Sequence, residues 1–504
     1  MADAIPTLSL SEFIRAYPEH NRQSQYSRYH ELAKRFRSVY NREPNFIARA
    51  PGRVNLIGEH IDYVGFGVLP MAISGDILIA VSVDDDSSTV RIKNVDDSKY
   101  KSREWQYEGD EQIVTIENDE GSVEWSNYFK CGYKGILQRF KLFCPKGLLC
   151  LVDGNVPPGA GLSSSSAFVC CAAIAVSYAN NIETDKTTMA KIAIECERYI
   201  GVNGGGMDQT TSIFAVTNQA LYISFRPTLH PTLIKLPSLS PPLTFVVSNS
   251  LVTSNKAATA QTNYNLRVVE TKLAAYYLGT VIMRKGCDTL WDVANQYMDG
   301  KEIDSKSLRE LANIVEEKIG NKQLGYSIVE LTELLSLTSE QVTEKFLTKF
   351  PVRAKTFHLY KRAKHVFEEA ARVLEFYSLC QTSTHSDESM TGHIKADQVY
   401  SELGQLMNSS HDSCRDLYDC SCVEVDELVR VCLECGAKGS RLTGAGWGGC
   451  VVSIVSGNES EEFISKVTEK YYNVRFPDLP KERLSEVIFE TLPGAGAAVI
   501  TTLQ

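Results

Sequence analysis

The segment from Leu151 to Phe168 limits the possible folds more than any other part of this sequence. An apolar run typical of a β-strand leads into a turn rich in glycine and proline, and four serines then open an apolar run with helical periodicity. Glycines let the backbone approach an anion closely, and the amides at a helix N-terminus favour negative charge. Helix capping alone needs one serine, so the segment predicts a phosphate-binding loop. The residues expected to contact the phosphates are Gly159, Gly161, Ser163, Ser164 and Ser165.

The motifs of two large classes of phosphoryl-transfer proteins are absent. The sequence contains no Gly-x-x-x-x-Gly-Lys-Ser/Thr loop, and it lacks the His-Arg-Asp and Asp-Phe-Gly motifs of protein kinases. A different architecture must therefore hold any nucleotide.

Strand-like and helix-like patterns alternate along the 504 residues, which predicts an α+β fold. Length alone allows about two to four domains. The proline-rich stretch from Pro227 to Pro242 predicts a surface connection near a domain boundary. We expect an N-terminal domain over residues 1–230 and a C-terminal domain with helical insertions over residues 231–504.

Charge and hydropathy exclude several kinds of partner. The 62 acidic residues outnumber the 52 Lys and Arg residues, and the resulting net charge of −10 opposes broad binding to nucleic acid or to an anionic membrane. No apolar run reaches the roughly 18 residues of a membrane span, and Met1 to Arg15 lack a signal-peptide pattern. We expect a cytoplasmic protein without nucleic-acid or membrane partners.

A cluster of cysteines, Cys420, Cys422, Cys432 and Cys435, loosely resembles a zinc site. However, the apolar residues between Val423 and Cys435 recur at helical spacing, and Gly436 follows them. We therefore favour an amphipathic helix that ends at Gly436 over a zinc site.

A second polar segment, Pro51 to Tyr63, packs Arg53, Glu59, His60 and Asp62 into ten residues. Such a density of donors and acceptors suits a polyhydroxylated ligand, because a site that pairs each hydroxyl rejects analogues that leave a group unpaired. The alternative is a solvated loop, but the flanking residues are strongly apolar and imply that these groups are held against a core.

Two further glycine-rich segments complete the set. In the first, Tyr199 to Gln209, three glycines lead into Asp208, which is either a general base or an ordinary helix start. The second, Gly439 to Cys450, is expected to join a helix to a strand. It is either a tight structural turn or a loop that closes on the phosphates.

Taken together and in this order, these segments resemble the galactokinase branch of the GHMP small-molecule kinases. Gly52–Tyr63 resembles the sugar signature, Pro158–Ala167 the shared ATP loop, and Leu442–Gly449 the third shared motif. Similarity to eukaryotic members extends to Trp125–Phe129 and Leu406–Cys414, and the match covers about residues 30 to 500. The resemblance implies a two-domain α+β fold with ATP and sugar in the cleft between the domains. The N-terminal domain is then like the second domain of ribosomal protein S5, and the C-terminal domain is ferredoxin-like.

The implied reaction is the transfer of a phosphoryl group from MgATP to the anomeric hydroxyl of D-galactose, the first step of galactose catabolism by the Leloir pathway. Asp208 matches the proposed base, and Arg53 matches the cation beside it. By the same resemblance, the sugar contacts are Arg53, Glu59, His60, Asp62, Gly205, Asp208 and Tyr264. The ATP contacts are the serine loop together with Trp125, Asn255 and Lys256, and the Mg²⁺ ligands are Ser165 and Glu197.

Two alternatives stay open. The segments Gly204–Gln209 and Asn408–His411 also resemble N-acetylgalactosamine kinase, whereas Tyr264 resembles the galactose-specific members, since the N-acetyl-sugar enzyme carries Phe there. The other alternative is a galactose-sensing transcriptional regulator that binds sugar and ATP without kinase activity. Such sensors lack two residues of the serine loop, which is uninterrupted here from Gly161 to Ala167. A regulatory protein partner is not excluded.

Overall fold

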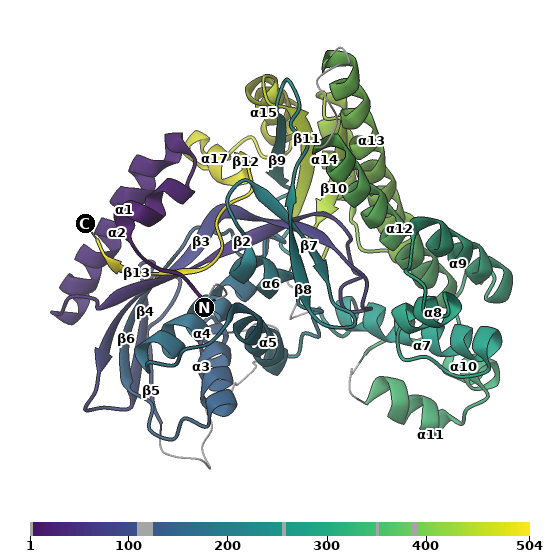
Figure 1. Cartoon of the computed structure of the whole chain (residues 1–504), viewed down its shortest axis with the longest axis horizontal. Helices are drawn as coiled ribbons and strands as arrows, with labels where there is room; N and C mark the ends of the chain where they lie inside the picture. The colour runs from purple at the N-terminus through teal and green to yellow at the C-terminus, as the bar shows by residue number, and fades with distance from the viewer. Residues whose placement is uncertain (1–3, 108–123, 255–258, 349–351, 385–391, 504) are drawn as a thin grey trace.

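The computed structural model describes residues 4–107, 124–254, 259–348, 352–384 and 392–503. A seven-stranded sheet has the strand order β1-β13-β2-β3-β6-β4-β5 (Figure 1). Neighbouring strands are antiparallel except for the pairs β1–β13 and β4–β6, which are parallel. In sheet order the strands are β1 (Thr7–Ser9), β13 (Ala498–Thr502), β2 (Phe46–Ile57), β3 (Leu69–Asp84), β6 (Gly147–Gly154), β4 (Thr89–Asn94) and β5 (Arg103–Gln106).

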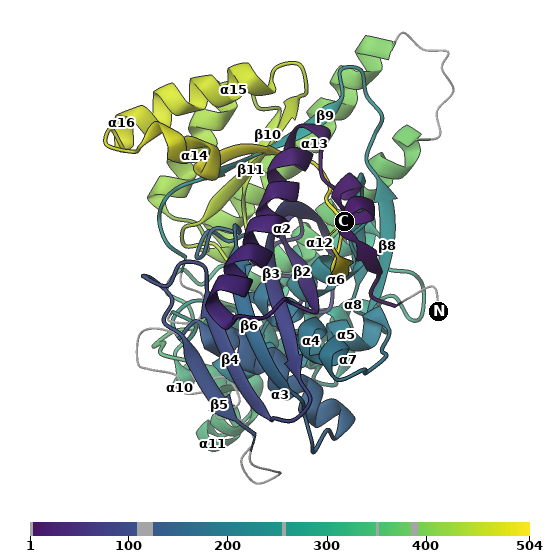
Figure 2. The same cartoon turned by 90° about the vertical axis from the view of Figure 1, so that its left-hand side faces the viewer.

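Helices cover both faces of this sheet, because alternate residues of each strand point to opposite sides. Phe46 and Ala48 of β2 pack in the hydrophobic cluster with α3 and α4, whereas Ile47 packs in the cluster with α2. Figure 2 shows α2 lying across its face of the sheet. The helices of this region are α1 (Leu10–Phe13), η1 (Ile14–Ala16), α2 (Glu19–Tyr40), α3 (Ser126–Phe140), α4 (Ser164–Ala179), α5 (Lys186–Glu197), η3 (Arg198–Ile200) and α6 (Met207–Phe214).

A second, antiparallel sheet has the order β10-β11-β9-β12. Its strands are β9 (Leu243–Asn249), β10 (Gly439–Thr443), β11 (Cys450–Ser456) and β12 (Ile488–Thr491). The helical segments near it in sequence are η5 (Cys414–Tyr418), α14 (Val423–Glu434), α15 (Ser460–Val467), η6 (Thr468–Tyr472), α16 (Asn473–Arg475), η7 (Lys481–Arg483) and α17 (Leu484–Val487). The mixture of helices and two main sheets confirms the predicted α+β class.

A two-stranded ribbon, β7 (Gln219–Ser224) with β8 (His230–Lys235), precedes the second sheet. The strand β8 lies inside the proline-rich stretch that was expected to be a connection, so this part of the prediction was wrong. Pro231 pairs with Ile223 across the ribbon. A strand at an edge accepts proline because its missing N–H can face outward.

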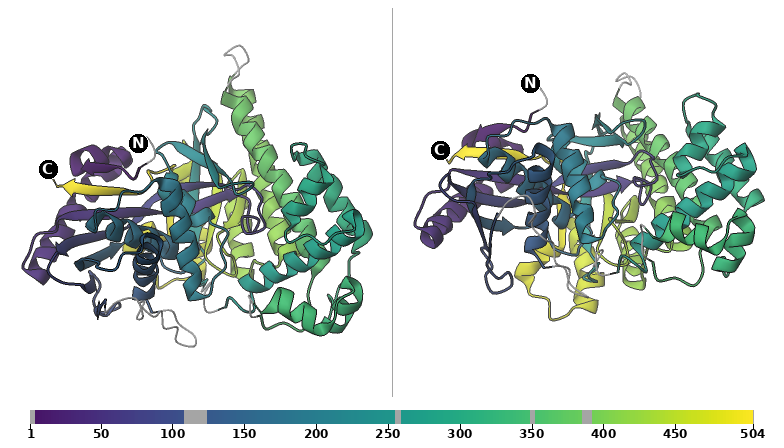
Figure 3. Two further views of the ribbon diagram at one scale, coloured as in Figure 1. Left: turned by 60° about the horizontal axis from the view of Figure 1, so that its bottom comes forward. Right: turned by 90° about the horizontal axis from the view of Figure 1, so that it is seen from below.

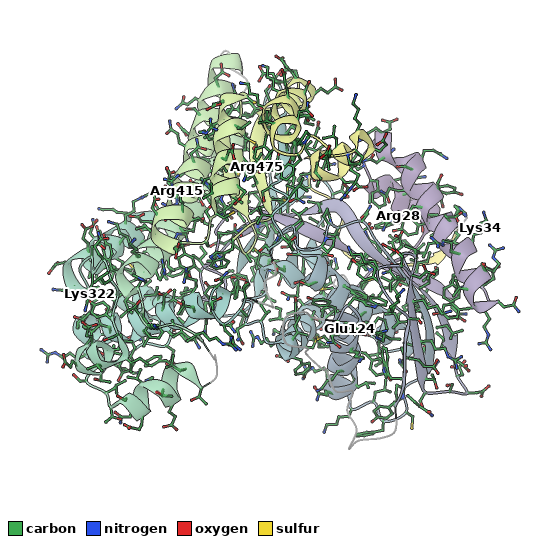
Figure 4. All side chains as sticks on the ribbon, turned by 180° about the vertical axis from the view of Figure 1, so that it is seen from behind. Arg28, Lys34, Glu124, Lys322, Arg415 and Arg475 are labelled. Carbon is green, nitrogen blue, oxygen red and sulfur yellow. The ribbon has the colours of Figure 1, made fainter. Side chains whose placement is uncertain are left out.

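A helical lobe lies on the side of the molecule away from both chain ends (Figure 3). Figure 4 shows Lys322 in this lobe and Arg28 of α2 at opposite ends of the molecule. The lobe and the long helices beside it are α7 (Tyr264–Met283), α8 (Leu290–Tyr297), α9 (Ser305–Lys318), α10 (Ile328–Leu335), α11 (Ser339–Val342), η4 (Thr343–Leu347), α12 (Leu359–Thr384) and α13 (Gly392–Ser413).

The two ends of the chain meet in the larger sheet, where β13 lies between β1 and β2. The last strand thus belongs to the sheet of the N-terminal region, and the division at residues 230 and 231 stays a prediction. In the part of the chain that is described, no helix is both long and apolar enough to cross a membrane. The cytoplasmic location also stays a prediction.

Candidate functional site

A pocket of about 480 Å³ brings together three segments that are far apart in the sequence. Arg53 and the turn after β2 form one part of its wall, Asp208 and the start of α6 form another, and Gly444 and Ala445 form a third. Tyr264, the first residue of α7, also lines it. Most of the polar residues that line this pocket are those named from the sequence.

Arg53 and Asp208 form an ion pair at this pocket. Arg53 Nε donates to Asp208 Oδ1 at 2.8 Å, and Arg53 Nη2 lies 2.6 Å from the same oxygen. Arg53 Nη1 donates to the carbonyl oxygen of Gly161 at 2.5 Å. Asp208 lies in the first turn of α6, where the helix dipole stabilises negative charge. The guanidinium therefore joins the acid to the predicted phosphate loop.

Glu59 is buried with both carboxylate oxygens bonded to protein. Oε1 accepts from the N–H of Gly444 at 2.8 Å, and Oε2 accepts from Asn55 Nδ2 at 2.9 Å and Arg441 Nη2 at 2.8 Å. Burial raises the pKa of Glu59 above its usual value, and the positive charges of Arg441 and Arg53 oppose this effect. The carboxylate thus ties the end of β2 to the glycine-rich turn between β10 and β11.

Asn55 and Arg441 are site residues that the sequence motifs do not predict. Arg441 is fully buried in β10, where it also donates to the backbone oxygen of Asn55 at 2.9 Å. A lone arginine in a short strand between glycine-rich segments was the available signal, since a buried guanidinium needs a carboxylate partner.

His60 follows Glu59 in the left-handed conformation, with φ of 62°. Its Nε2 lies 2.9 Å from the carbonyl oxygen of Ala445, and its Nδ1 lies 3.1 Å from the hydroxyl of Tyr63. The rings of Tyr63, Tyr264, Tyr418 and Trp447 surround it, with centroids 4.9 to 5.9 Å away.

Asp62 and Tyr264 line the side of the pocket nearest α6 and α7, and Gly205 lies between two further lining residues, Gly204 and Gly206. The N–H of Met207 donates to Asp62 Oδ2 at 3.4 Å. A side chain at position 205 would place its Cβ 2.3 Å from the backbone nitrogen of Tyr63, so only glycine fits. Burial raises the pKa of the Tyr264 hydroxyl well above its usual value, and Asp62 and Asp208 raise it further, so this hydroxyl stays protonated as a donor.

The serine loop lies beside Asp208. Ser166 Oγ donates to Glu197 Oε2 at 2.7 Å and lies 3.5 Å from Asp208 Oδ2, and Gln209 also donates to Glu197 Oε2. The serine bonded to Glu197 is therefore Ser166, whereas the sequence predicts Ser165 as the partner of Glu197. Successive helical residues point about 100° apart, and the helix begins at Ser164.

Ser163 precedes α4 with φ of 60°, and its Oγ is buried without a hydrogen-bond partner among the described residues. A buried unpaired hydroxyl is costly unless a ligand or water satisfies it.

Two glycine-rich turns lie directly against each other. A Cβ on Gly161 would lie 2.7 Å from the carbonyl oxygen of Thr443, and one on Gly444 would lie 2.3 Å from that of Gly161. The segment Gly439–Cys450 follows helix α14 and leads into strand β11, as expected, but its first residues form the further strand β10, so the turn after Thr443 itself joins two strands. The residues of β10 are buried and pair with β11, which outweighs their unremarkable local sequence.

Trp125 lies at the start of α3, outside the pocket. Its ring stacks on Phe168 of α4 with centroids 6.0 Å apart, and its Nε1 donates to the carbonyl oxygen of Lys101 at 2.9 Å. Asn255 and Lys256 lie outside the described residues. Their neighbour Ser254 donates its N–H to the carbonyl oxygen of Gly159 at 2.8 Å.

Comparisons with known proteins agree with this geometry. Residues 34–83 match the galactokinase galactose-binding signature, residues 127–215 the GHMP kinase N-terminal domain, and residues 395–473 the GHMP kinase C-terminal domain. The chain is 39% identical to the galactokinase of Saccharomyces cerevisiae, over 93% of this chain and 94% of the yeast protein. It is 38% identical to the galactokinase of Dictyostelium discoideum, over 96% of each.

The fold is similar to that of the galactose-bound galactokinase from Lactococcus lactis, with a TM-score of 0.66 and 22% identity over 93% of this chain and 98% of that protein. The mevalonate kinase of Methanococcus jannaschii has a TM-score of 0.50 at 16% identity, covering 89% of this chain and 98% of that protein. The expected GHMP kinase fold is thus confirmed. Because the similarity to curated galactokinases extends over nearly the full length, the chain belongs to the galactokinase family of GHMP kinases.

Proposed function

We propose that this protein transfers the γ-phosphoryl group of ATP to the anomeric hydroxyl of D-galactose, which gives galactose 1-phosphate and ADP. One observation carries the proposal. The Arg53–Asp208 pair opens onto the pocket that the polar turn after β2 also lines, and Arg53 is bonded to the serine loop through the carbonyl of Gly161. The proposed base, the cation beside it, the polar turn that would bind sugar hydroxyls and the predicted phosphate loop thus lie next to one another.

In the proposed reaction, Asp208 accepts the proton of the anomeric hydroxyl as that oxygen forms its bond to the γ-phosphorus. The bond from phosphorus to the β,γ-bridging oxygen breaks, and ADP leaves. A carboxylate within reach of the hydroxyl supplies general base catalysis. Arg53 stabilises the negative charge of Asp208 and of the transferring group.

The phosphates of ATP are assigned to the loop from Gly159 to Ser165 and to the N-terminus of α4. The positive φ values of Gly159, Gly161 and Ser163 and the unpaired buried hydroxyl of Ser163 support an anion here. Trp125, Asn255 and Lys256 remain proposed nucleotide contacts.

The residues around Glu197 fit Mg²⁺, which prefers oxygen ligands. The hydroxyl of Ser166 lies between the carboxylates of Glu197 and Asp208. Within the described ranges, no group of three His, Cys, Asp or Glu residues forms a metal site, so phosphate oxygens and water would have to complete the coordination. The ion would neutralise phosphate charge, and Ser165, the neighbouring position, is the alternative hydroxyl ligand.

Galactose is assigned to the wall formed by Glu59, His60, Asp62, Gly205 and Tyr264. Tyr264 supports galactose over an N-acetyl sugar, because tyrosine at this position resembles the galactose-specific members. The intact serine loop supports a kinase over a sugar sensor. A cytoplasmic location belongs to the same proposal and is independent of the chemistry.

The test measures ADP release by the purified full chain with galactose, N-acetylgalactosamine or glucose at one ATP concentration, with and without Mg²⁺. We expect turnover with galactose that depends on Mg²⁺, and much slower turnover with the other two sugars. Faster turnover with the acetylated sugar would overturn the substrate assignment. Binding of galactose and ATP without ADP release would favour the sensor.

A further inference from the structure

Two tyrosine hydroxyls without an assigned role extend a hydrogen-bonded chain from His60 into the protein. The hydroxyl of Tyr63 lies 3.1 Å from His60 Nδ1 and 2.6 Å from the hydroxyl of Tyr418. On the other side of the ring, His60 Nε2 lies 2.9 Å from the carbonyl oxygen of Ala445. The chain therefore runs from η5, through the turn after β2, to the glycine-rich turn between β10 and β11.

The carbonyl oxygen of Ala445, at one end of this series of hydrogen bonds, determines which atom donates in each bond. A carbonyl oxygen only accepts, so Nε2 of the neutral imidazole carries the proton and Nδ1 must accept from Tyr63. Tyr63 has a single proton, and it is used on His60, so Tyr418 donates to the oxygen of Tyr63. Burial raises the pKa of both tyrosines above the usual value, which keeps both hydroxyls protonated.

At its His60 end, this series of hydrogen bonds fixes the position of part of the pocket wall. Two bonds tie the turn after β2 to the glycine-rich turn: Gly444 N–H to Glu59 Oε1 at 2.8 Å, and His60 Nε2 to the Ala445 oxygen. Gly444 and Ala445 both line the pocket. Without the hydroxyl of Tyr63, the imidazole proton is free to move to Nδ1, and the bond to Ala445 is then lost.

We propose that Tyr63 and Tyr418 are positioning residues that act in series. Tyr418 orients the hydroxyl of Tyr63, Tyr63 fixes the tautomer of His60, and His60 fixes Ala445 against the sugar. Neither tyrosine touches the reacting atoms in this scheme. The inference rests on the proposed function, because it concerns the affinity of that same pocket for its sugar.

The test compares Tyr63→Phe, Tyr418→Phe and the double variant by KM for galactose, kcat and thermal midpoint. We expect Tyr63→Phe to raise KM about tenfold and Tyr418→Phe about threefold, with kcat within about twofold of wild type. Tyr63→Phe removes the bond to His60 and the bond to Tyr418, Tyr418→Phe removes only the bond between the two tyrosines, and neither bond involves the reacting atoms. If the two tyrosines act in series, Tyr418 acts only through Tyr63, and the double variant should have the same KM as Tyr63→Phe alone.

Tyr400→Phe is the matched control. The Tyr400 hydroxyl is also buried with its ring, but it donates to the carbonyl oxygen of Pro241 at 3.0 Å, at a distance from the pocket. We expect this variant to lower the thermal midpoint and leave KM unchanged. A role confined to stability would make Tyr63→Phe behave in the same way.

Unchanged KM in Tyr63→Phe, or multiplying effects in the double variant, would overturn the inference and leave the proposed function standing. If Tyr63→Phe does not fold, Tyr418→Phe decides, because unchanged KM there also overturns the series. A wild-type chain that releases no ADP with galactose would overturn the proposed function, and the inference with it.

Discussion

Strand β2 carries two arginines, Arg49 and Arg53, that each pair with an aspartate in different surroundings. Arg49 and its partner Asp76 have side chains that are 1% and 0% exposed. Arg53 and its partner Asp208 are 5% and 14% exposed and line the pocket. The chemical groups are the same, so the surroundings decide what each pair can do.

The Arg49 pair is saturated by protein groups. Asp76 also accepts from Arg28 Nη1 at 2.6 Å and from the hydroxyl of Tyr17 at 2.5 Å. Arg49 Nη1 donates to the carbonyl oxygens of Ala495 and Gly496, just before β13. This cluster holds the first helices, the large sheet and the last strand together, whereas the Arg53 pair faces the space in which a substrate fits.

The largest expected effect is on catalysis, in Asp208→Asn. Asparagine keeps an oxygen for Arg53 but cannot accept a proton, so kcat should fall by about a hundredfold to ten-thousandfold. The unfolding free energy should change by about 1 kcal/mol or less. ADP release and urea unfolding check both parts. Strong galactose-dependent turnover by this variant would remove Asp208 from the mechanism.

The matched change in the other pair, Asp76→Asn, should have the opposite profile. It leaves the buried Arg49 without a negative charge, while Arg28 keeps its ion pair with Asp153, and breaking a buried pair costs about 3–5 kcal/mol of stability. Because Asp76 lies outside the pocket wall, kcat per folded molecule should be unchanged. Urea unfolding and ADP release normalised to folded protein measure these quantities. Lost activity in fully folded protein would contradict the division of roles.

The pH dependence of the unfolding free energy gives a further test of the buried Arg49–Asp76 pair. Burial alone would raise the pKa of Asp76, but Arg28 and Arg49 outweigh burial and hold this pKa below its usual value of 3.8. The folded state therefore takes up this proton less readily than the unfolded state. The contribution of Asp76 is complete above the unfolded pKa and is lost as the pH falls through the folded pKa.

Unfolding measurements in acid test this sign. Below a pH of about 4, the unfolding free energy of wild type should fall more steeply than that of Asp76→Asn, which has no carboxyl group to protonate at this position. Identical acid profiles for the two proteins would show that Asp76 is not the group that titrates.

Local chemistry explains which features could be predicted from the sequence. The strand, glycine turn and helix from Gly147 to Ala179 depend on neighbouring residues, and they form where expected. The helix before Gly436 also forms, as α14, and this glycine has a φ of 113°. The sugar signature and the third shared motif likewise contribute residues to one pocket, and the ATP loop is bonded to Arg53 of this pocket through the carbonyl oxygen of Gly161.

Features that depend on contacts between residues far apart in the sequence could not be predicted in the same way. The bond from Arg441 to Glu59 joins residues 382 positions apart. The pairing of β10 with β11 depends on buried residues rather than on strand propensity. The difference between Ser165 and Ser166 depends on the exact phase of α4, which composition does not determine.

The smallest expected effect is that of Ser166→Ala, which tests whether the phase of α4 gives Ser166 the role predicted for Ser165. Its hydroxyl joins Glu197 to Asp208, so its removal should raise the Mg²⁺ concentration for half-maximal activity about fivefold to tenfold, with most of kcat retained at saturating Mg²⁺. Ser177→Ala on the same helix is the control, because that hydroxyl donates to the carbonyl oxygen of Ile182. If Ser165→Ala raises the Mg²⁺ requirement and Ser166→Ala does not, Ser165 is the ligand after all. The hydroxyl of Ser166 would then orient Glu197 and Asp208 without touching the ion. In that case the position of Asp208 beside Arg53 would depend on one more contact within the protein.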